Sequence, residues 1–325
     1  MAVSTDWRRA RLTPAEQAML EFGEKLTLHP SGMREGDVQS LRRHAFDDGE
    51  ILSIVLAAAY RNFITRVADA LGVELRSAGH YAPEILRAFG VTEADVRTSI
   101  YADRLGAGTR ASGAAPLRPR AATAAGRRAP GTCWIDTSPA DPGRFGDLCD
   151  ELARLTAPRP QRHLALAFAR RPEALEATLA FGQLLGMGGS GLGRRLEVII
   201  GLVVAATLGV PYRGVHHAHV WLDAGASREE VERAVMAPAA AGRDGREHEV
   251  ARFCEKVTRV PSAMSRPDAE ALRAAGFDDR EILAIAAAAA FETFLCGMAA
   301  GTGIALEEGP FHPAALQAFA VMARA

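Results

Sequence analysis

Two stretches of this 325-residue chain repeat each other without a gap, and this duplication constrains the fold more than any other feature. Residues 21–72 align with residues 252–303 over their whole length. Within them, the segments LRRHAFDDGEIL and LRAAGFDDREIL share eight of twelve residues. A repeat of this length without insertions predicts that one structural unit is built twice.

The repeated stretch has the sequence pattern of helices. Thr13 and Pro14 supply an N-cap and a first-turn proline for a helix that extends to about residue 27. Further helices are predicted over residues 35–44 and 48–71, because their apolar residues recur at helical spacing. Almost no stretch alternates polar and apolar residues as a half-buried strand would. The sequence therefore predicts an all-α protein built from tandem repeats of a helical bundle.

The composition along the chain divides it into three parts. Residues 103–134 are rich in Ala, Gly, Pro and Arg and have few large apolar side chains, so they cannot bury enough surface to offset the entropy of ordering. We interpret them as a flexible linker. Residues 1–102 and 135–325 are then two helical domains, the second of which is the larger.

Overall composition excludes several classes of protein. The net charge of −1 and the lack of a basic stripe argue against a nucleic-acid partner. Four scattered cysteines provide no secreted disulfide framework, and the N-terminus lacks a signal-peptide pattern. The longest apolar runs, at residues 198–210 and 282–291, are too short to cross a membrane. We expect a cytoplasmic protein that has no membrane partner and acts on a small molecule.

Most of the residues with chemical potential lie in residues 194–221. An apolar run ends near Gly209, and Pro211 is suited to begin a new helix. On that helix Arg213 and His217 are four residues apart and share a face, and the same holds for Tyr212 and His216. His219 is three residues beyond His216. Ionisable groups at the end of an apolar run are candidates for shifted pKa values and for function.

This layout resembles the carboxymuconolactone decarboxylase and alkylhydroperoxidase-D (AhpD) superfamily, in particular its peroxidase-related branch. The resemblance rests on Leu196-Glu197, on Tyr212 to His217, and on residues 223–231. Redox members carry a C-x-x-C motif, whose two cysteines would fall at Val210 and Arg213 in this chain, followed by a histidine that matches His217. The upstream glutamate matches Glu197 to within one residue. The resemblance also implies that residues 135–325 form a complete AhpD-like domain, that residues 1–102 are a copy without its catalytic half, and that the protein is a homo-oligomer.

Both cysteines of the redox motif are missing, so dithiol peroxide chemistry is not expected at this position. The non-redox branch instead uses the histidine as an acid or base without a cofactor. That resemblance implies that His217 is the general acid–base, that Glu197 orients it, and that Arg213 binds a substrate carboxylate, with Tyr212 and His216 beside them. The implied reactions on a small carboxylated or oxygenated substrate are decarboxylation, isomerisation and elimination, which indicates a lyase-like enzyme.

Two residues of the first copy extend this hypothesis. Asn62 and Arg66 lie four residues apart on one helical face, where the peroxidase-related branch usually has an Asn-x-x-x-Arg pair. We expect them, together with His219, to contact the substrate across the interface between the two copies. The glycine-rich residues 186–193 precede the Glu197 helix and could act as a lid.

Two alternatives remain open from the sequence. His216, His219 and a carboxylate such as Glu197 or Asp223 could together bind iron, zinc or copper. Alternatively, the chain is a helical scaffold or binding protein that lost its activity with its cysteines. The cofactor-independent enzyme requires no metal, so the metal content of the purified protein distinguishes it from the metal-binding alternative.

Overall fold

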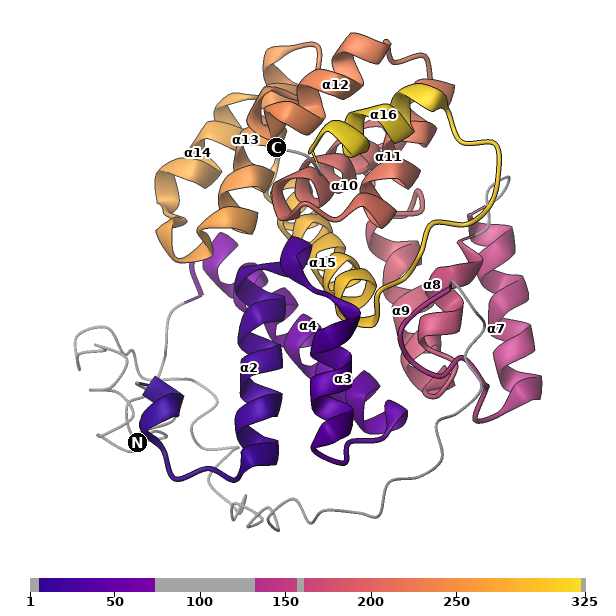
Figure 1. Ribbon diagram of the computed structural model, residues 1–325. Coiled ribbons are helices and arrows are strands. Elements are labelled where there is room, and N and C mark those ends of the chain that lie inside the picture. The colour runs from indigo at the N-terminus through magenta and orange to yellow at the C-terminus, as the bar shows by residue number, and fades with distance from the viewer. Residues whose placement is uncertain (1–5, 74–131, 157–160, 323–325) are drawn as a thin grey trace, which may run out of the picture.

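The computed structural model describes residues 6–73, 132–156 and 161–322, and every regular element within these ranges is a helix (Figure 1). The predicted all-α class is therefore confirmed. Most of the expected linker lies outside the described residues. Its last three residues, 132–134, are described and packed, since the backbone N–H of Trp134 donates to Thr302 (2.7 Å) and Cys133 is buried.

A short 3-10 turn, η1 (Trp7–Arg9), precedes the first copy of the repeat, which forms three helices. These are α2 (Pro14–Leu28), α3 (Glu35–Arg43) and α4 (Asp48–Ala70), with the 3-10 turn η2 (Pro30–Gly32) between α2 and α3. Thr13 caps α2 in a capping box with Glu16, as its sequence position predicts.

The second copy forms the same elements in the same order: α13 (Gly245–Arg259), η6 (Pro261–Ala263), α14 (Arg266–Ala274) and α15 (Asp279–Thr302). Even its polar contacts recur. Lys25 binds Asp37 at 2.8 Å in the first copy, and Lys256 binds Asp268 at 2.7 Å in the second. Each copy of the duplicated sequence therefore forms the same set of helices.

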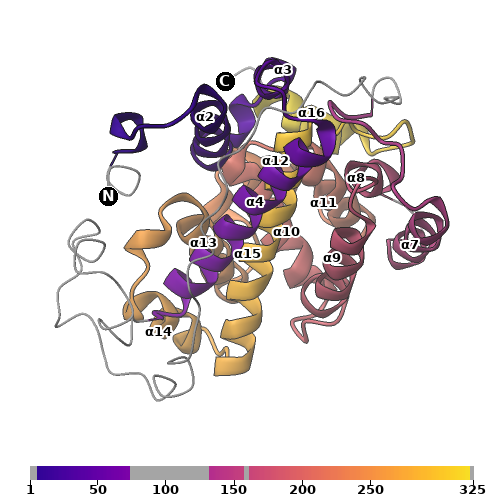
Figure 2. The same cartoon turned by 90° about the horizontal axis from the view of Figure 1, so that it is seen from below.

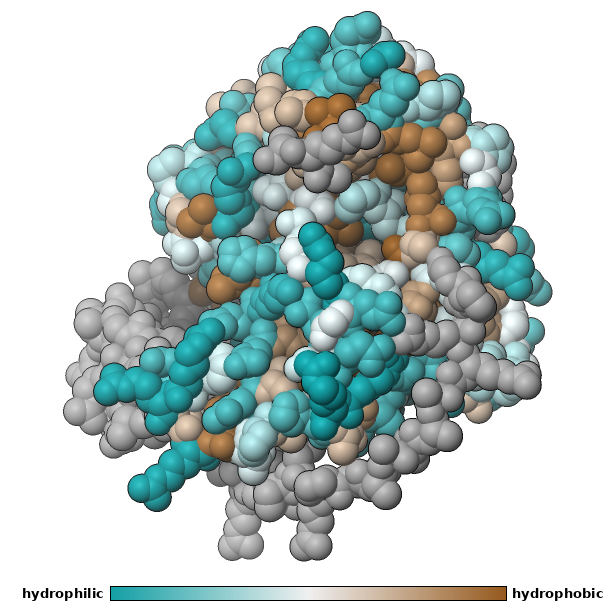
Figure 3. All heavy atoms as spheres, in the orientation of Figure 1, coloured by the Kyte–Doolittle hydropathy of each residue, from teal (hydrophilic) through white to brown (hydrophobic). Residues whose placement is uncertain are grey.

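The remaining helices surround the second copy. They are α7 (Pro142–Leu155), α8 (Arg162–Ala167), α9 (Pro172–Leu185), α10 (Arg194–Leu208), α11 (Pro211–Asp223), α12 (Arg228–Met236), the turn η5 (Pro238–Ala240) and α16 (Pro313–Met322). In Figure 3, apolar side chains gather on the surface around α16. Three of them, Met236, Leu316 and Val321, are more than 40% exposed.

The two long repeated helices, α4 and α15, lie side by side at the centre of the molecule (Figure 2). Small residues of α15 allow the close approach. A Cβ at Gly297 would lie 3.1 Å from the Cβ of Ala59, and one at Gly301 would lie 2.8 Å from Val55. Through this contact the first copy shares one continuous hydrophobic core with the rest of the chain. One side of α15 is thus occupied by α4, and its other side is available to the helices that carry the histidines.

Both helices are long and apolar enough to cross a membrane by length and composition alone. In α15, however, 78% of the most apolar window is buried inside the protein, compared with 28% in α4. Burial of this kind is what a core helix requires, and α15 is the helix on which the candidate site is built.

Candidate functional site

The predicted apolar helix and the histidine-bearing helix that follows it are both present. Helix α10 ends at Gly209, which adopts a left-handed conformation (φ 65°), and α11 begins at Pro211. Glycine takes that conformation without the steric cost of a Cβ, so the chain can reverse direction there. Two thirds of the residues of α10 are buried, as are most of those of α11. The polar side chains of α11 are therefore held in an interior, where each needs a partner.

His217 lies directly against the backbone of α10. A Cβ at Gly201 would lie only 2.2 Å from Cε1 of the imidazole and 2.3 Å from its Nε2. Only glycine leaves room for the ring at this point. Helix packing therefore fixes the position of the imidazole.

An ion pair between α11 and α15 contacts Nε2 of the ring. Arg213 donates from Nε to Oε1 of Glu292 at 2.7 Å and from Nη2 to Oε2 at 2.8 Å, which is a bidentate pair. Nε2 of His217 lies 3.1 Å from Nη2 of Arg213 and 3.2 Å from Oε2 of Glu292. The Nη1 group of Arg213 also donates to Gln161. Arg213, Glu292 and His217 thus form one contiguous cluster, named here the Arg–Glu–His cluster.

Burial and charge set the protonation states in the Arg–Glu–His cluster. Burial raises the pKa of the Glu292 carboxyl, but Arg213 and His217 outweigh this effect and lower it to about 2. Burial lowers the pKa of His217 below its ordinary 6.5, and the positive charge of Arg213 lowers it further, while Glu292 only partly offsets both. At neutral pH the cluster therefore contains an ionised Glu292 and a neutral His217.

His217 and Arg213 border a small cavity of about 80 Å³ between α7, α9, α10, α11 and α15. A cavity needs a volume of roughly 10–15 Å³, on the same measure, to hold one water molecule. This cavity therefore has room for a small organic molecule. Its wall is mainly apolar, and the lining includes Leu152, Leu155, Leu164, Leu175, Leu179, Met187, Phe291 and Leu295. Glu197, His216 and His219 also line it. The structure therefore brings most of the predicted site residues to one cavity.

Glu197 reaches this cavity but has different partners from those expected. Its buried carboxylate accepts hydrogen bonds from the backbone N–H of Gly188 at 2.9 Å and from the hydroxyl of Ser190 at 2.6 Å. The expected pairing of Glu197 with His217 is therefore wrong, because the carboxylate beside His217 is that of Glu292. Glu197 instead fastens the glycine-rich residues 186–193, part of which borders the cavity.

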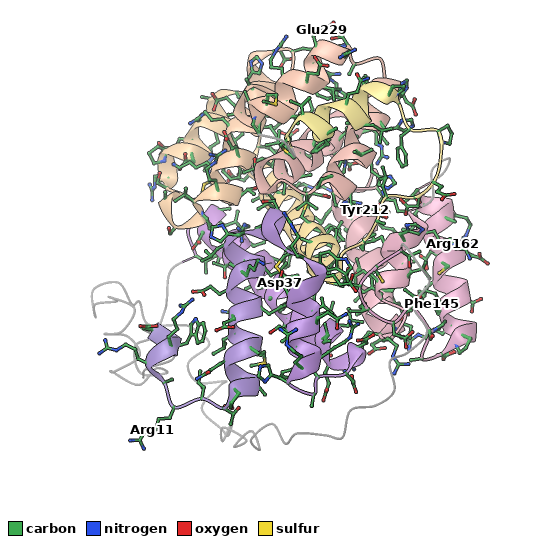
Figure 4. All side chains as sticks on the ribbon, viewed as in Figure 1. Arg11, Asp37, Phe145, Arg162, Tyr212 and Glu229 are labelled. Atoms are coloured by element: carbon green, nitrogen blue, oxygen red, sulfur yellow. The ribbon has the colours of Figure 1, made fainter. Side chains whose placement is uncertain are left out.

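Tyr212 and His216 belong to a second polar network, which is centred on Glu307. The hydroxyl of Tyr212 donates to Oε1 of Glu307 at 2.8 Å, and Nε2 of His216 lies 2.9 Å from Oε2 of the same carboxylate. The Tyr212 hydroxyl also accepts from the backbone N–H of Leu164 on α8. Figure 4 labels Tyr212 and Arg162, the first residue of α8. Burial lowers the pKa of His216, although Glu307 opposes that shift. This network ties α8 and the segment after α15 to α11.

His219 has a third set of neighbours. Its Nδ1 accepts the backbone N–H of His312 at 3.0 Å, and its Nε2 lies 3.1 Å from Oδ2 of Asp223. His312 in turn contacts Asp223 at 3.0 Å. The ligand atoms of these three residues lie within 4.8 Å of one another, close enough to be considered as a metal site.

The chemistry of His219 does not fit a metal ion at that position. A metal on Nε2 requires the ring proton on Nδ1, where it normally donates to an acceptor. Here Nδ1 faces an N–H donor instead. The ligand set expected from the sequence is also not assembled, because His216 is engaged with Glu307. The arrangement fits a hydrogen-bonded His–Asp–His group better than a metal centre.

Asn62 and Arg66 do not border the cavity, so the expected contact with a substrate at His217 is wrong for the site as described. Arg66 is buried and donates to the carbonyl of Thr258 near the end of α13 (3.0 Å) and to Oδ1 of Asn62 (3.2 Å). Asn62 donates to Thr27 on α2 (3.2 Å). These side chains connect α4 to its neighbours, and Arg66 gives a partner to a backbone carbonyl in the buried last turn of α13.

Sequence reasoning missed the residue that organises the site, Glu292. One signal could have revealed it: Glu292 is the only charged residue in the apolar stretch from residue 282 to residue 304. An acidic residue inside a buried helix needs a cationic partner. The duplication also singles it out, because the first copy has Arg61 at the corresponding position.

Residues 172–256, from α9 into α13, match the carboxymuconolactone decarboxylase family. Over this segment the chain is similar to the carboxymuconolactone decarboxylase and AhpD-like superfamily. A comparison with curated proteins finds no match. Among solved structures the chain is similar to the alkylhydroperoxidase AhpD core of an uncharacterized peroxidase-related protein from Ralstonia eutropha JMP134. The two share 22% sequence identity with a TM-score of 0.46, over 50% of this chain and 86% of that one.

The part of the chain that matches the superfamily contains Glu197, Arg213 and His217, whereas Glu292 lies beyond it in the second copy of the repeat. The two positions that the redox motif would occupy are Val210, which precedes α11, and Arg213, which is paired with Glu292. The family match over residues 172–256 is compatible with either an enzyme or a scaffold built on these helices.

Proposed function

We propose that this protein is a cofactor-independent enzyme of the non-redox type, in which His217 transfers protons to and from a small oxygenated substrate. One observation supports it above all: a neutral imidazole borders an enclosed cavity and is fixed by a buried Arg–carboxylate pair. A general base must be deprotonated at working pH and held in place, and His217 meets both conditions.

The two ring nitrogens of His217 differ in their contacts with the Arg–Glu–His cluster. Nε2 faces both a donor, Arg213, and an acceptor, Glu292, so it is satisfied with or without a proton. No described residue binds Nδ1, so Nδ1 is the nitrogen that exchanges a proton with the substrate. When Nδ1 takes up a proton, the Nε2–H group donates to Glu292, whose negative charge stabilises the imidazolium.

Thiol chemistry is not part of this proposal. The nearest sulfur to the cluster is Cys296, whose Sγ lies 3.8 Å from Oε1 of Glu292. Burial and the charge of Glu292 raise the pKa of this thiol well above 9, so it stays protonated. A protonated thiol is a poor nucleophile.

Proton exchange at carbon tests this function whatever the natural reaction is. A panel of small ketones, lactones and carboxylic acids is incubated with the protein in deuterated buffer, and exchange beside the carbonyl is followed by NMR. We expect exchange of at least one compound, lost in His217→Gln and kept in His248→Gln, which alters an exposed histidine on α13. If no compound exchanges, or if His217→Gln exchanges at the wild-type rate, the proposal fails.

A further inference from the structure

The guanidinium of Arg213 is already bound by other side chains of the protein, and this limits the ligands that it can bind in the cavity. It uses Nε and Nη2 for Glu292 and Nη1 for Gln161. Its side chain is only 6% exposed and that of Glu292 only 7%. Arginine binds a ligand carboxylate through the same planar fork that Glu292 fills here.

A ligand carboxylate could bind the Nη1–Nη2 edge of Arg213 only by displacing Gln161 and His217. It could bind the Nε–Nη2 edge only by displacing Glu292. Displacing Glu292 would leave a second carboxylate buried without its partner, and breaking a buried ion pair in this way is strongly unfavourable. The expectation that Arg213 binds a substrate carboxylate is therefore not supported by the geometry.

The other charges that border the cavity are also balanced among themselves. Glu197 is buried at the cavity wall, and the guanidinium of Arg194 lies 3.8 Å from it. Among the described lining residues, each cationic side chain thus has a carboxylate of this chain beside it. Most of the remaining wall is apolar, and an apolar wall favours the binding of apolar ligands.

We infer that this cavity binds an uncharged, largely apolar small molecule with one carbonyl-type oxygen, and not a carboxylate. The inference rests on the proposed function only in placing the ligand beside His217. The apolar wall holds the carbon frame, and the neutral imidazole faces the polar group. An anionic ligand would have to meet Glu197 and Glu292 without an unpaired cation to receive it.

Two ligands of the same shape but different charge test this inference. Benzamide and benzoate are compared by NMR titration at pH 7.5, with the wild-type protein and with His217→Gln. Because binding is measured without turnover, failure of the proposed chemistry does not affect the result. We expect benzamide to bind at least about tenfold more tightly than benzoate. Tighter binding of benzoate, or no binding of benzamide, overturns the inference.

A second variant tests the cause of this selectivity. In Glu292→Gln the guanidinium of Arg213 loses its anionic partner, so benzoate should gain about tenfold or more in affinity while benzamide changes little. An unchanged ratio between the two ligands would show that Glu292 does not set the selectivity. If this variant fails to fold, the wild-type comparison still decides which ligand the cavity prefers.

Discussion

The imidazole of His217 lies against the backbone of Gly201, so close that a single added carbon would sit 2.2 Å from Cε1 of the ring. This contact joins two neighbouring helices, α10 and α11, at the position where the chemistry is proposed. Arg213 and Glu292 both contact Nε2 of the ring, so moving the imidazole would break its contacts with this ion pair.

Replacing this glycine should therefore damage the site. We expect Gly201→Ala to reduce the free energy of unfolding by roughly 1–3 kcal/mol, the typical cost of overpacking a core. Gly146 in α7 provides the control, because a Cβ there meets nothing within 4 Å. Gly146→Ala should stabilise the protein by about 0.5–1 kcal/mol through helix propensity. Denaturation by urea measures both, and equal effects of the two variants would contradict the packing described here.

The Arg–Glu–His cluster should behave as a buried ion pair that needs both partners. Arg213→Met leaves Glu292 buried without its counter-charge and should cost about 3–5 kcal/mol of stability. The double variant Arg213→Met/Glu292→Leu should recover much of this loss. The exposed pair Arg252–Glu249 on α13 is the matched control, where Arg252→Met should cost less than about 1 kcal/mol. If Arg213→Met also reduces the stability by less than about 1 kcal/mol, the Arg–Glu–His cluster is exposed to solvent and the account of it is wrong.

Much of this architecture could be predicted from the sequence, because helix caps and periodicity are local. The junction at Gly209 and Pro211, the start of α9 at Pro172 and the helices of the repeat all follow from residues within one or two turns. The gap-free duplication also indicated two equivalent units, and the structure has them.

The partners of the site residues could not be predicted in the same way. Glu197 and Glu292 are each the only carboxylate in an apolar stretch, and sequence spacing does not show which one faces His217. That choice depends on how α15 is rotated between α4 and α11, a property of long-range packing. The role of Arg66 was missed for the same reason, because its partner, the carbonyl of Thr258, lies far away in the sequence.

The shifted pKa of His217 has a measurable pH dependence. Its value in the folded protein lies below 6.5, so the folded state binds its proton less readily than the unfolded state does. Stability from this group is therefore complete above pH 6.5 and decreases as the pH falls through the lowered value. NMR titration of the His217 Cε1 proton, identified by its absence in His217→Gln, measures the midpoint. A midpoint at or above 6.5 would be inconsistent with the burial described.

Glu197 should act on substrate entry and not on proton transfer. Glu197→Gln places an amide N–H near the N–H donors of residues 188–190 and should loosen that loop. We expect faster hydrogen exchange of the loop amides and a higher KM, with kcat changed less than about threefold. Ser190→Ala, which removes one hydrogen bond to the same carboxylate, should show a milder form of both effects. A large loss of kcat without faster amide exchange would instead return Glu197 to a role in the chemistry.

The most direct test of the central claim is chemical rescue of His217→Ala with added imidazole. For any compound whose proton exchange the protein catalyses, this variant should be slower by roughly 10²–10⁴, the usual contribution of a general acid–base. Free imidazole should then restore part of the rate, with the restored part growing as the pH rises and the imidazole loses its proton. A His217→Ala variant that exchanges protons at the wild-type rate without imidazole would contradict the account.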